Sequence, residues 1–273
     1  MILAIDIGNT NIVIGCIDKQ KTYFIERLST VRTKTELEYA IDIKTVLDIY
    51  NIDKEEIEGG IISSVVPQIT NIAKLAAEKI IKKNVMVLGP GIKTGLNILM
   101  DQPASLGADL VADAVAGIAE YPTPLIVIDM GTATTVSVVD EKKNYIGGMI
   151  LPGVRVALDA LTSIASQLSG ISLDVPKKVI GKNTIDCMKS GVLYSNAGAL
   201  DGIIDRMEEE LGQKATVVAT GGLAKKIVPL CKKDIILDED LLLKGLWVIY
   251  QKNKCLFVKF CYSFIMCIAI YPY

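Results

Sequence analysis

The sequence predicts an α/β protein made of two duplicated halves, and three observations support this prediction. Short apolar segments of β type alternate along the chain with segments whose apolar residues follow a helical spacing. The opening segment 1–10, an apolar run that ends in Asp-Ile-Gly-Asn-Thr, is repeated at 124–135 as an apolar run that continues into Asp-Met-Gly-Thr-Ala-Thr-Thr. In both halves a second β-type segment follows and ends in an aspartate, Asp18 or Asp140. A matched strand, turn and second strand indicates an internal duplication.

The first half, residues 1–120, is expected to open with a buried strand, a tight turn and a second strand that together form a hairpin. Apolar residues at helical spacing then predict a helix over 35–50. The other elements expected in this half are a strand over 60–66, a helix over 71–83, a strand over 85–88 and an alanine-rich helix over 110–119.

The second half, residues 121–254, repeats the opening hairpin and continues with a long helical stretch over 183–211. A short strand over 215–220 runs into the pair Gly221 and Gly222. A final helix is expected over 240–250. Because both halves carry an acidic turn rich in glycine or threonine, we expect a cleft between them.

Composition limits the chemistry that is open to this chain. Hydrophobic residues make up 51% of it and charged residues 22%, as in a globular protein with a large core. The net charge of −2, with no long basic run, argues against a nucleic-acid partner. The chain contains no histidine, so any general base must be Asp, Glu, Lys, Tyr or Cys. Serine–histidine and cysteine–histidine catalysis are therefore excluded.

The cysteines and the two ends of the chain bear on its location. The cysteines form no Cys-x-x-Cys pair, which favours buried or incidental thiols in a reducing cytoplasm over a zinc site. Met1 leads directly into a strand pattern, so we expect no signal peptide and a cytoplasmic protein.

The tail 255–273 is almost wholly apolar and near the minimum length of a membrane span. We favour a packed extra segment or a poorly selected extension over a membrane anchor, and the role of the tail stays open.

The two duplicated turns are candidates for binding phosphate. A glycine in a turn lets backbone N–H groups approach a phosphate closely, and the side chains of Asn9 and Thr10 can donate to its oxygens. Asp6 faces a phosphate comfortably only with a cation between them, so it implies Mg²⁺. An ordinary hairpin would explain the first turn alone. Asp129 and Gly131 at equivalent positions make a polyphosphate bound from both sides the favoured interpretation.

Other motifs bear on the nucleotide and on catalysis. Gly221 and Gly222 follow a predicted strand, which leaves room for a flat adenine or for an anion. The chain lacks Gly-x-x-x-x-Gly-Lys-Ser/Thr, so a P-loop site is excluded. Asp109 stands just before the predicted helix 110–119, where the alternatives are a helix cap and a general base that takes the proton of an alcohol. Asp113, one turn later, is expected to be mainly structural.

In their order and spacing, these motifs resemble those of the type III pantothenate kinases. The resemblance covers residues 1–253 and leaves out the tail. The segments that carry it are Asp6 to Asn11, Gly89 to Leu96, Gly107 to Asp109, Asp129 to Thr135, Gly147 and Gly148 with Pro152 and Gly153, Gly181 to Thr184, and Thr220 to Leu223.

The resemblance implies an actin-like ATPase fold, in which two ribonuclease H-like half-domains hold the nucleotide in the cleft between them. It implies ATP-dependent phosphorylation of pantothenate to 4'-phosphopantothenate, the first step of coenzyme A biosynthesis. It also implies Mg²⁺, a monovalent cation (K⁺ or NH₄⁺) and an obligate homodimer.

Carried over residue by residue, the resemblance implies roles for the motif positions. Asp109 would be the general base on the pantothenate hydroxyl, Asp129 would bind the monovalent cation, and Asp6 would hold Mg²⁺ through the phosphates. Thr184 would reach the pantothenate site across the dimer. The positions implied for ATP and its phosphates are Asp6, Gly8, Asn9, Thr10, Asn11, Gly131, Thr132, Ala133, Thr134, Gly221 and Gly222, and those for pantothenate are Met100, Gly107, Ala108, Asp109, Leu110 and Thr184.

The sequence departs from the family pattern on the pantothenate side. An arginine commonly follows Gly-Ala-Asp in the family, and Leu110 stands there in this chain. A tyrosine that often lines the pantothenate pocket is replaced by Met100. Losing the arginine removes a bidentate partner of the substrate carboxylate. We favour an active kinase over a degenerate paralogue, because the phosphate turns and Asp109 are intact.

Two alternatives to a pantothenate kinase stay open from the sequence. Leu110 and Met100 motivate a nucleotide-binding accessory or regulatory paralogue that has lost catalysis, which ATP binding without a phosphorylated product would support. A related actin-like kinase of another small alcohol is the second alternative, and a substrate screen would identify it.

Overall fold

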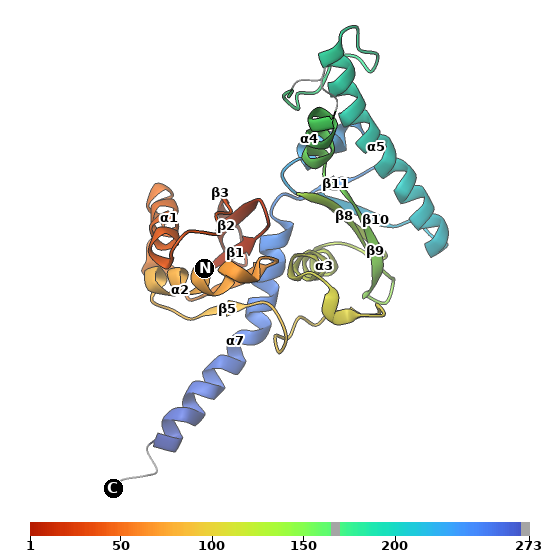
Figure 1. Cartoon of the computed structure of the whole chain (residues 1–273). Coiled ribbons are helices and arrows are strands. Elements are labelled where there is room, and N and C mark those ends of the chain that lie inside the picture. The colour runs from red at the N-terminus through yellow and green to blue at the C-terminus, as the bar shows by residue number, and fades with distance from the viewer. Residues whose placement is uncertain (165–169, 269–273) are drawn as a thin grey trace. The chain divides into compact units, whose positions relative to one another are not determined.

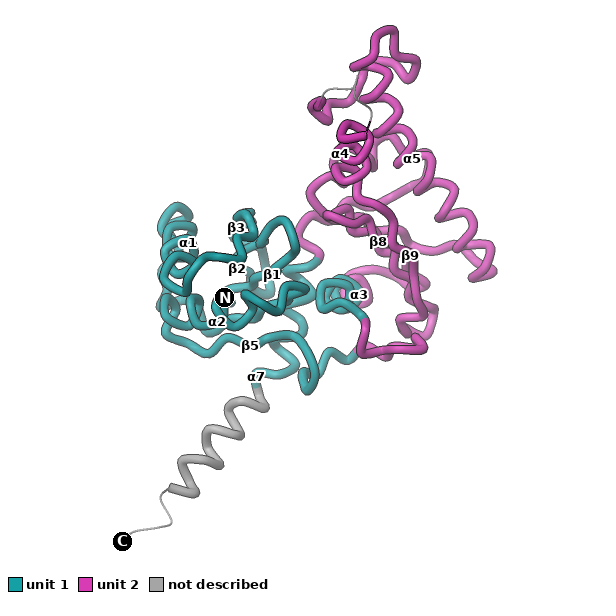
Figure 2. The backbone as a smooth tube through the Cα atoms, viewed as in Figure 1, with its two compact units in different colours: residues 1–95, 106–116, 242–273 teal, residues 96–105, 117–241 magenta. Residues whose placement is uncertain are grey.

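The computed structural model describes residues 1–164 and 170–268, with side chains up to residue 254. The chain divides into two compact units, which Figure 2 draws in different colours. Each unit contains one β-sheet and its own helices (Figure 1). Unit 1 comprises residues 1–95, 106–116 and 242–273, and unit 2 comprises residues 96–105 and 117–241.

The sheet of unit 1 has the strand order β3-β2-β1-β4-β5. Its first three strands form an antiparallel meander, and β4 and β5 continue the sheet in parallel to β1. Because β1 is the central strand, Asp6 near its end stands between Val13 of β2 and Ser63 of β4. The strands are β1 Ile2–Ile7, β2 Asn11–Ile17, β3 Thr22–Ser29, β4 Gly60–Ser64 and β5 Val85–Val87.

Two helices, α1 (Glu36–Ile49) and α2 (Pro67–Ile81), share the hydrophobic core of this sheet. Thr35 and Glu38 form a capping box at the start of α1, where the sequence predicted a helix start. The predicted start of the second helix at residue 71 is wrong, since α2 already begins at Pro67. Proline fits the first turn of a helix, because the N–H groups there have no partner within the helix.

The sheet of unit 2 repeats this topology, with the strand order β11-β10-β7-β8-β9-β6. β7, β8 and β9 form the meander, and β10 and β11 run parallel to β7. Burial along β7 matches burial along β1 position by position, with Asp129 and Asp6 at the same half-buried place. The strands are β6 Asn97–Ile98, β7 Leu125–Met130, β8 Ala133–Val139, β9 Asn144–Pro152, β10 Thr216–Thr220 and β11 Ile236–Leu237.

The shared topology confirms the predicted fold class of two duplicated, ribonuclease H-like half-domains of actin-like type. Three helices, α4, α5 and α6, share the hydrophobic core of unit 2 with its central strands. Their bounds are α4 Val154–Ile164, α5 Thr184–Leu211 and α6 Ala224–Ile227, and short 3₁₀ turns lie at Lys54–Glu56, Pro103–Ser105 and Val228–Leu230.

The last helix, α7 (Leu241–Ile268), groups with unit 1 from residue 242 onward, although the sequence prediction placed it in the second half. It runs far beyond the predicted end at residue 250. It crosses α3 (Ala108–Glu120) at very short range, because a Cβ on Gly245 would collide with the carbonyl of Ala112. The glycine therefore sets the distance between these two helices.

The apolar tail 255–273 is the part of the prediction that the structure leaves open. Its side chains, and all of residues 269–273, lie outside the described residues. Within the part of the chain that the structure describes, no helix is both long and apolar enough to cross a membrane.

Asn253 on α7 forms hydrogen bonds to the backbone of a loop of unit 1 that contains Lys93. Its side chain is 2% exposed, accepts a hydrogen bond from Lys93 N at 3.0 Å and donates one to Lys93 O at 2.9 Å. The neighbouring Lys252 Nζ donates to Thr94 O at 2.8 Å. The amide thus serves both backbone polar groups of Lys93, as a neighbouring strand would.

We expect Asn253→Ala to lower the free energy of unfolding by about 2 kcal/mol, because the backbone groups of Lys93 lose their partner. Urea unfolding followed by circular dichroism measures the change. Gln251→Ala is the control, since the side chain of Gln251 makes an exposed hydrogen bond to Glu58 whose loss should cost less than about 0.5 kcal/mol. Equal losses in the two variants would contradict the role given to Asn253.

Candidate active site

The first predicted phosphate turn lies between β1 and β2 in unit 1. Gly8 N donates to Asn11 O at 3.0 Å, which closes the turn, and Asn9, Thr10 and Asn11 are exposed. A Cβ on Gly8 would lie 3.0 Å from Asn11 O, so a larger residue would strain the turn. The turn therefore offers backbone N–H groups and polar side chains next to Asp6, as phosphate binding requires.

The segment that joins β3 to α1 supports this turn. Thr30 N donates to Thr10 O at 3.0 Å, and Thr30 Oγ1 donates to Gly8 O at 2.7 Å. Arg32 Nη2 donates to Asn9 Oδ1 at 3.2 Å. The sequence analysis missed these residues, because the contact joins positions far apart in the chain and no local motif marks it.

Asp109 lies in the first turn of α3, in unit 1. Leu110 N donates to Asp109 Oδ1 at 2.9 Å, which orients the carboxyl group. Burial raises the pKa of Asp109 above its ordinary value of 3.8, and hydrogen bonds from backbone N–H groups oppose this rise. A carboxylate with a raised pKa accepts a proton more readily, so the environment suits a general base.

Gly107 leaves the space that the Asp109 carboxyl occupies. A Cβ at Gly107 would collide with Asp109 Oδ1, so any larger residue displaces the carboxyl. Val111 N donates to Gly107 O at 3.1 Å, so the same glycine also starts the helical hydrogen bonding of α3. The close contact between Ala112 of α3 and Gly245 of α7 helps to fix the position of the helix that carries Asp109.

The second predicted turn, between β7 and β8 in unit 2, is also closed by a bond from its glycine but is one residue shorter. Gly131 N donates to Ala133 O at 3.0 Å, and Gly131 and Thr132 are exposed. Thr134 is 2% exposed, and its hydroxyl has no hydrogen-bond partner among the described residues. A Cβ on Gly153 would collide with Thr132 O, so the backbone that leads into α4 packs directly on the turn.

Gly221 lies beside Asp129, because β10 pairs with β7 and places Thr220 opposite Asp129. Its φ of +94° belongs to a region that favours glycine, and a Cβ there would lie 2.5 Å from Asp129 Oδ1. Gly222 follows as an exposed residue. The sheet thus brings together two parts that the sequence predicted separately, the acidic turn and the glycine pair.

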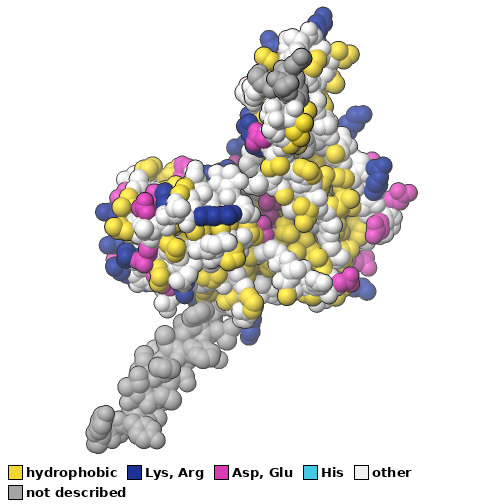
Figure 3. Space-filling view, viewed as in Figure 1, with side chains coloured by type: hydrophobic (Ala, Val, Ile, Leu, Met, Phe, Trp, Pro, Cys, Tyr) yellow, Lys and Arg dark blue, Asp and Glu magenta, His cyan; other side chains and the backbone are white. Residues whose placement is uncertain are grey.

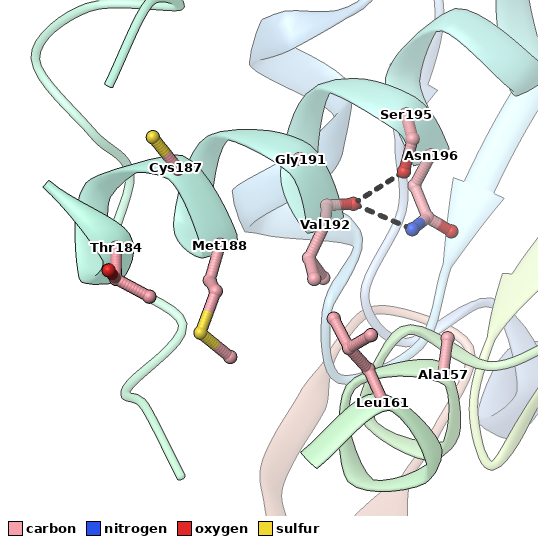
Figure 4. A pocket seen from close by; sticks show the side chains of 9 residues that line it. All are labelled: Ala157, Leu161, Thr184, Cys187, Met188, Gly191, Val192, Ser195 and Asn196. Carbon is pink, nitrogen blue, oxygen red and sulfur yellow. Dashed lines mark hydrogen bonds between the residues drawn. The ribbon is translucent and has the colours of Figure 1, made fainter. Parts of the chain in front are cut away.

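Thr184 lies in a different place, at the start of α5. It lines a pocket of about 560 Å³ between α4 and α5, which Figure 4 shows from close by. Leu161, Met188 and Val192 give this pocket an apolar wall. Of the predicted site residues that the structure describes, Thr184 is the one that lines this pocket.

The two residues that depart from the family pattern are both half-buried. Leu110 lies in the first turn of α3, and Met100 follows β6 in unit 2. Neither side chain carries a positive charge, so neither replaces an arginine as a partner for a carboxylate. Ala108, the first residue of α3, lies next to Asp109 and is also half-buried.

Comparison with known proteins gives a consistent result. The family model described as type III pantothenate kinase matches residues 2–206. A type III pantothenate kinase of Bacillus cytotoxicus is 44% identical over 256 residues, which cover 94% of this chain and 98% of that protein. The one of an Exiguobacterium species is 45% identical over 254 residues, or 93% and 100% of the two chains. Among solved structures, a Baf family protein from Campylobacter jejuni aligns with a TM-score of 0.57 at 20% identity, over 93% of this chain and 99% of its own, which shows a shared fold.

The raised pKa of Asp109 predicts a gain in stability for Asp109→Asn at neutral pH. Below pH 3.8 the carboxyl is protonated in both the folded and the unfolded chain, so it does not lower the free energy of unfolding. As the pH rises from 3.8 toward the raised pKa, the unfolded chain ionises first, so the contribution of Asp109 to the free energy of unfolding falls across this window. Asparagine keeps the acceptor for Leu110 N and cannot ionise.

Urea unfolding at pH 7.5, and at the lowest pH at which both proteins stay folded, measures this difference. We expect Asp109→Asn to be more stable than wild type at pH 7.5. The difference between their free energies of unfolding should be smaller at the lower pH. Asp101→Asn, at an exposed position, is the control and should change stability by less than about 0.5 kcal/mol. A variant that is no more stable than wild type at pH 7.5 would contradict the burial of this charge.

Proposed function

The chain belongs to the type III pantothenate kinase family, and on that premise we propose how its residues carry out the reaction. The protein transfers the γ-phosphate of ATP to pantothenate in coenzyme A synthesis. The observation that supports our assignment of residue roles is the pair of equivalent acidic turns, each at the end of a central buried strand.

In our proposal the two turns hold the phosphates of ATP. Residues 8–11 in unit 1 and residues 131–134 in unit 2 offer backbone N–H groups and side-chain donors. Phosphoryl transfer asks the protein mainly to position the reactants and to stabilise charge, so such donors are the larger part of the catalytic machinery. Gly221 and Gly222 would border the adenine, since they follow β10 and carry no side chain that could block a flat ring.

Asp109 would be the general base. Its carboxylate would accept the proton of the pantothenate hydroxyl as the oxygen bonds to the γ-phosphorus and the bond to ADP breaks. Gly107 and Ala108 would lie against the substrate at the start of α3. Leu110 and Met100 supply apolar surface rather than a charge, so the pantothenate carboxylate would need another partner in this chain.

The donor set fits the proposed cations. Among the described residues there is no group of three or more Asp, Glu, Cys or His side chains that could hold a metal by themselves. Mg²⁺ commonly binds through one or two carboxylates together with substrate phosphates, which suits Asp6 as the protein's contribution. At Asp129, Gly221 packs so closely that a Cβ would lie 2.5 Å from Oδ1, and the carboxylate oxygens would be the protein's ligands to K⁺ or NH₄⁺. Bound there, these cations would neutralise phosphate charge.

We also expect a homodimer, in which Thr184 of one subunit reaches the pantothenate site of the other. Exposed hydrophobic residues in unit 2 support this proposal, since a contiguous apolar patch on a protein surface often marks an interface. Ile150 is 77%, Ile164 is 85% and Ile180 is 81% exposed. Figure 3 shows hydrophobic side chains gathered on one face of unit 2.

A coupled ADP-release assay with ATP, Mg²⁺ and pantothenate tests the proposed function. We expect turnover that depends on pantothenate and that is higher with K⁺ than with Na⁺ alone. Turnover without added pantothenate, or on another small alcohol in preference to it, would contradict the assignment of the substrate. Equal rates in K⁺ and Na⁺ would contradict the monovalent site.

Asp109→Asn is expected to lower kcat by at least about a hundredfold, because the hydroxyl loses its proton acceptor. In the wild type, kcat should fall as the pH drops through the raised pKa of Asp109, so the acid limb lies above pH 3.8. Asp101→Asn is again the matched control. An Asp109→Asn protein with undiminished turnover would remove Asp109 from the role of base.

A further inference from the structure

ATP brings a concentrated negative charge to a site whose predicted residues are neutral or acidic. Asp6, Asp109 and Asp129 are carboxylates, and the residues of the two turns carry no charge. Phosphoryl transfer is generally assisted by arginine or lysine that neutralises phosphate charge. A protein cation close to one of the turns is therefore expected on physical grounds, and the predicted site does not contain one.

The structure brings one arginine into hydrogen-bond contact with a phosphate turn. Arg32 Nη2 donates to Asn9 Oδ1 at 3.2 Å, and Arg32 is exposed. Its segment is held in place by Thr30, whose N–H and hydroxyl bond to Thr10 O and Gly8 O. Tyr39 from α1 adds a further bond, because its hydroxyl donates to Val31 O at 2.8 Å. The position of Arg32 beside the turn is thus set by several contacts.

We propose that Arg32 binds a phosphate group of ATP and completes the phosphate site of unit 1, an inference that rests on the kinase function proposed above. A guanidinium has five N–H donors in a planar fork, so one can stay on Asn9 while others bond to phosphate oxygens. Arginine suits this task better than lysine, because its fork matches two oxygens at once.

The contact also fixes the orientation of Asn9. A guanidinium only donates, so the amide oxygen of Asn9 must face Arg32. The amide NH₂ group therefore points away from Arg32 and can donate to a second phosphate oxygen. Arg32 therefore supplies positive charge and also orients the NH₂ group of Asn9 as a donor to phosphate.

The other cations near this turn are less suited to the role. Lys34 Nζ bonds to Asp42 Oδ2 at 2.6 Å and lies over the ring of Tyr39. Arg32, in contrast, forms no ion pair within 4.0 Å with a carboxylate of the described residues. Arg27 lies on β3 opposite Val13 and has no hydrogen bond to the turn in the described structure. Arg27 is thus a matched control.

The test compares Arg32→Gln, Arg32→Lys and Arg27→Gln by steady-state kinetics and by direct titration with a fluorescent ATP analogue. For Arg32→Gln we expect roughly a tenfold or greater loss of nucleotide affinity, a raised KM for ATP and little change in KM for pantothenate. Arg32→Lys should recover part of the loss, and Arg27→Gln should behave as wild type. Added guanidinium ion should partly restore Arg32→Gln.

A second comparison separates direct phosphate binding from an effect through Asn9. In an Asn9→Ala background, Arg32→Gln should still weaken nucleotide binding severalfold. No further loss in that background would overturn the proposal, because Arg32 would then act only by orienting Asn9. Unchanged nucleotide affinity of Arg32→Gln in the wild-type background would also overturn it.

Because the titration needs no turnover, it separates this proposal from the proposed function. A wild type that binds the ATP analogue but does not phosphorylate pantothenate would refute the function and leave the test of Arg32 valid. A wild type that phosphorylates pantothenate, with Arg32→Gln equal to it in all constants, would refute the role of Arg32 alone.

Discussion

The structure depends on the burial of two equivalent strands, β1 and β7, each of which ends in a tight turn at the surface. Both strands have buried neighbours on either side in their sheets, so their positions are fixed by packing and by two ladders of hydrogen bonds. The strand anchors the turn that leaves it, and in unit 1 hydrogen bonds from Thr30 to Gly8 O and Thr10 O add further support. The chain can therefore present backbone N–H groups at a defined place, which is what binding of a polyphosphate demands.

The fold could be predicted well from the sequence where local patterns determine it. The repeated run of apolar residues, aspartate and glycine reports burial and a turn in the same few residues, and the capping residue Thr35 marks a helix start directly. The predicted start of α2 and end of α7 were wrong, because the limits of these helices depend on packing as well as on local pattern. That α7 joins unit 1 is set by its contacts with α3 and with Lys93, which no local pattern reveals.

In the candidate site, too, local sequence patterns predict some features, and contacts between distant residues determine the others. Asp6 and Asp129 stand out in the sequence because the same acidic turn with a glycine occurs twice, and Asp109 stands out because it precedes a predicted helix in a chain without histidine. The close approach of Gly221 to Asp129 arises from pairing between β10 and β7, and Arg32, in the segment after β3, contacts Asn9 in the turn after β1. Such contacts join distant positions, so a single sequence does not disclose them.

Electrostatics links these parts in our proposal. The chain has no histidine, so a carboxylate must serve as base, and burial adjusts the pKa of Asp109 in the direction that this role requires. Carboxylates near phosphates need compensation, which we assign to cations at Asp6 and Asp129 and to the guanidinium of Arg32. In the same proposal, Leu110 would affect the recognition of pantothenate and leave this compensation intact.

Hydrogen–deuterium exchange with a non-hydrolysable ATP analogue tests the central claim most directly. Our account predicts slower exchange of the backbone amides of residues 8–11 and 131–134 when the analogue is bound, with residues 35–50 unchanged. Unchanged exchange in both turns, at an analogue concentration that saturates the protein, would contradict the claim that these turns hold the phosphates.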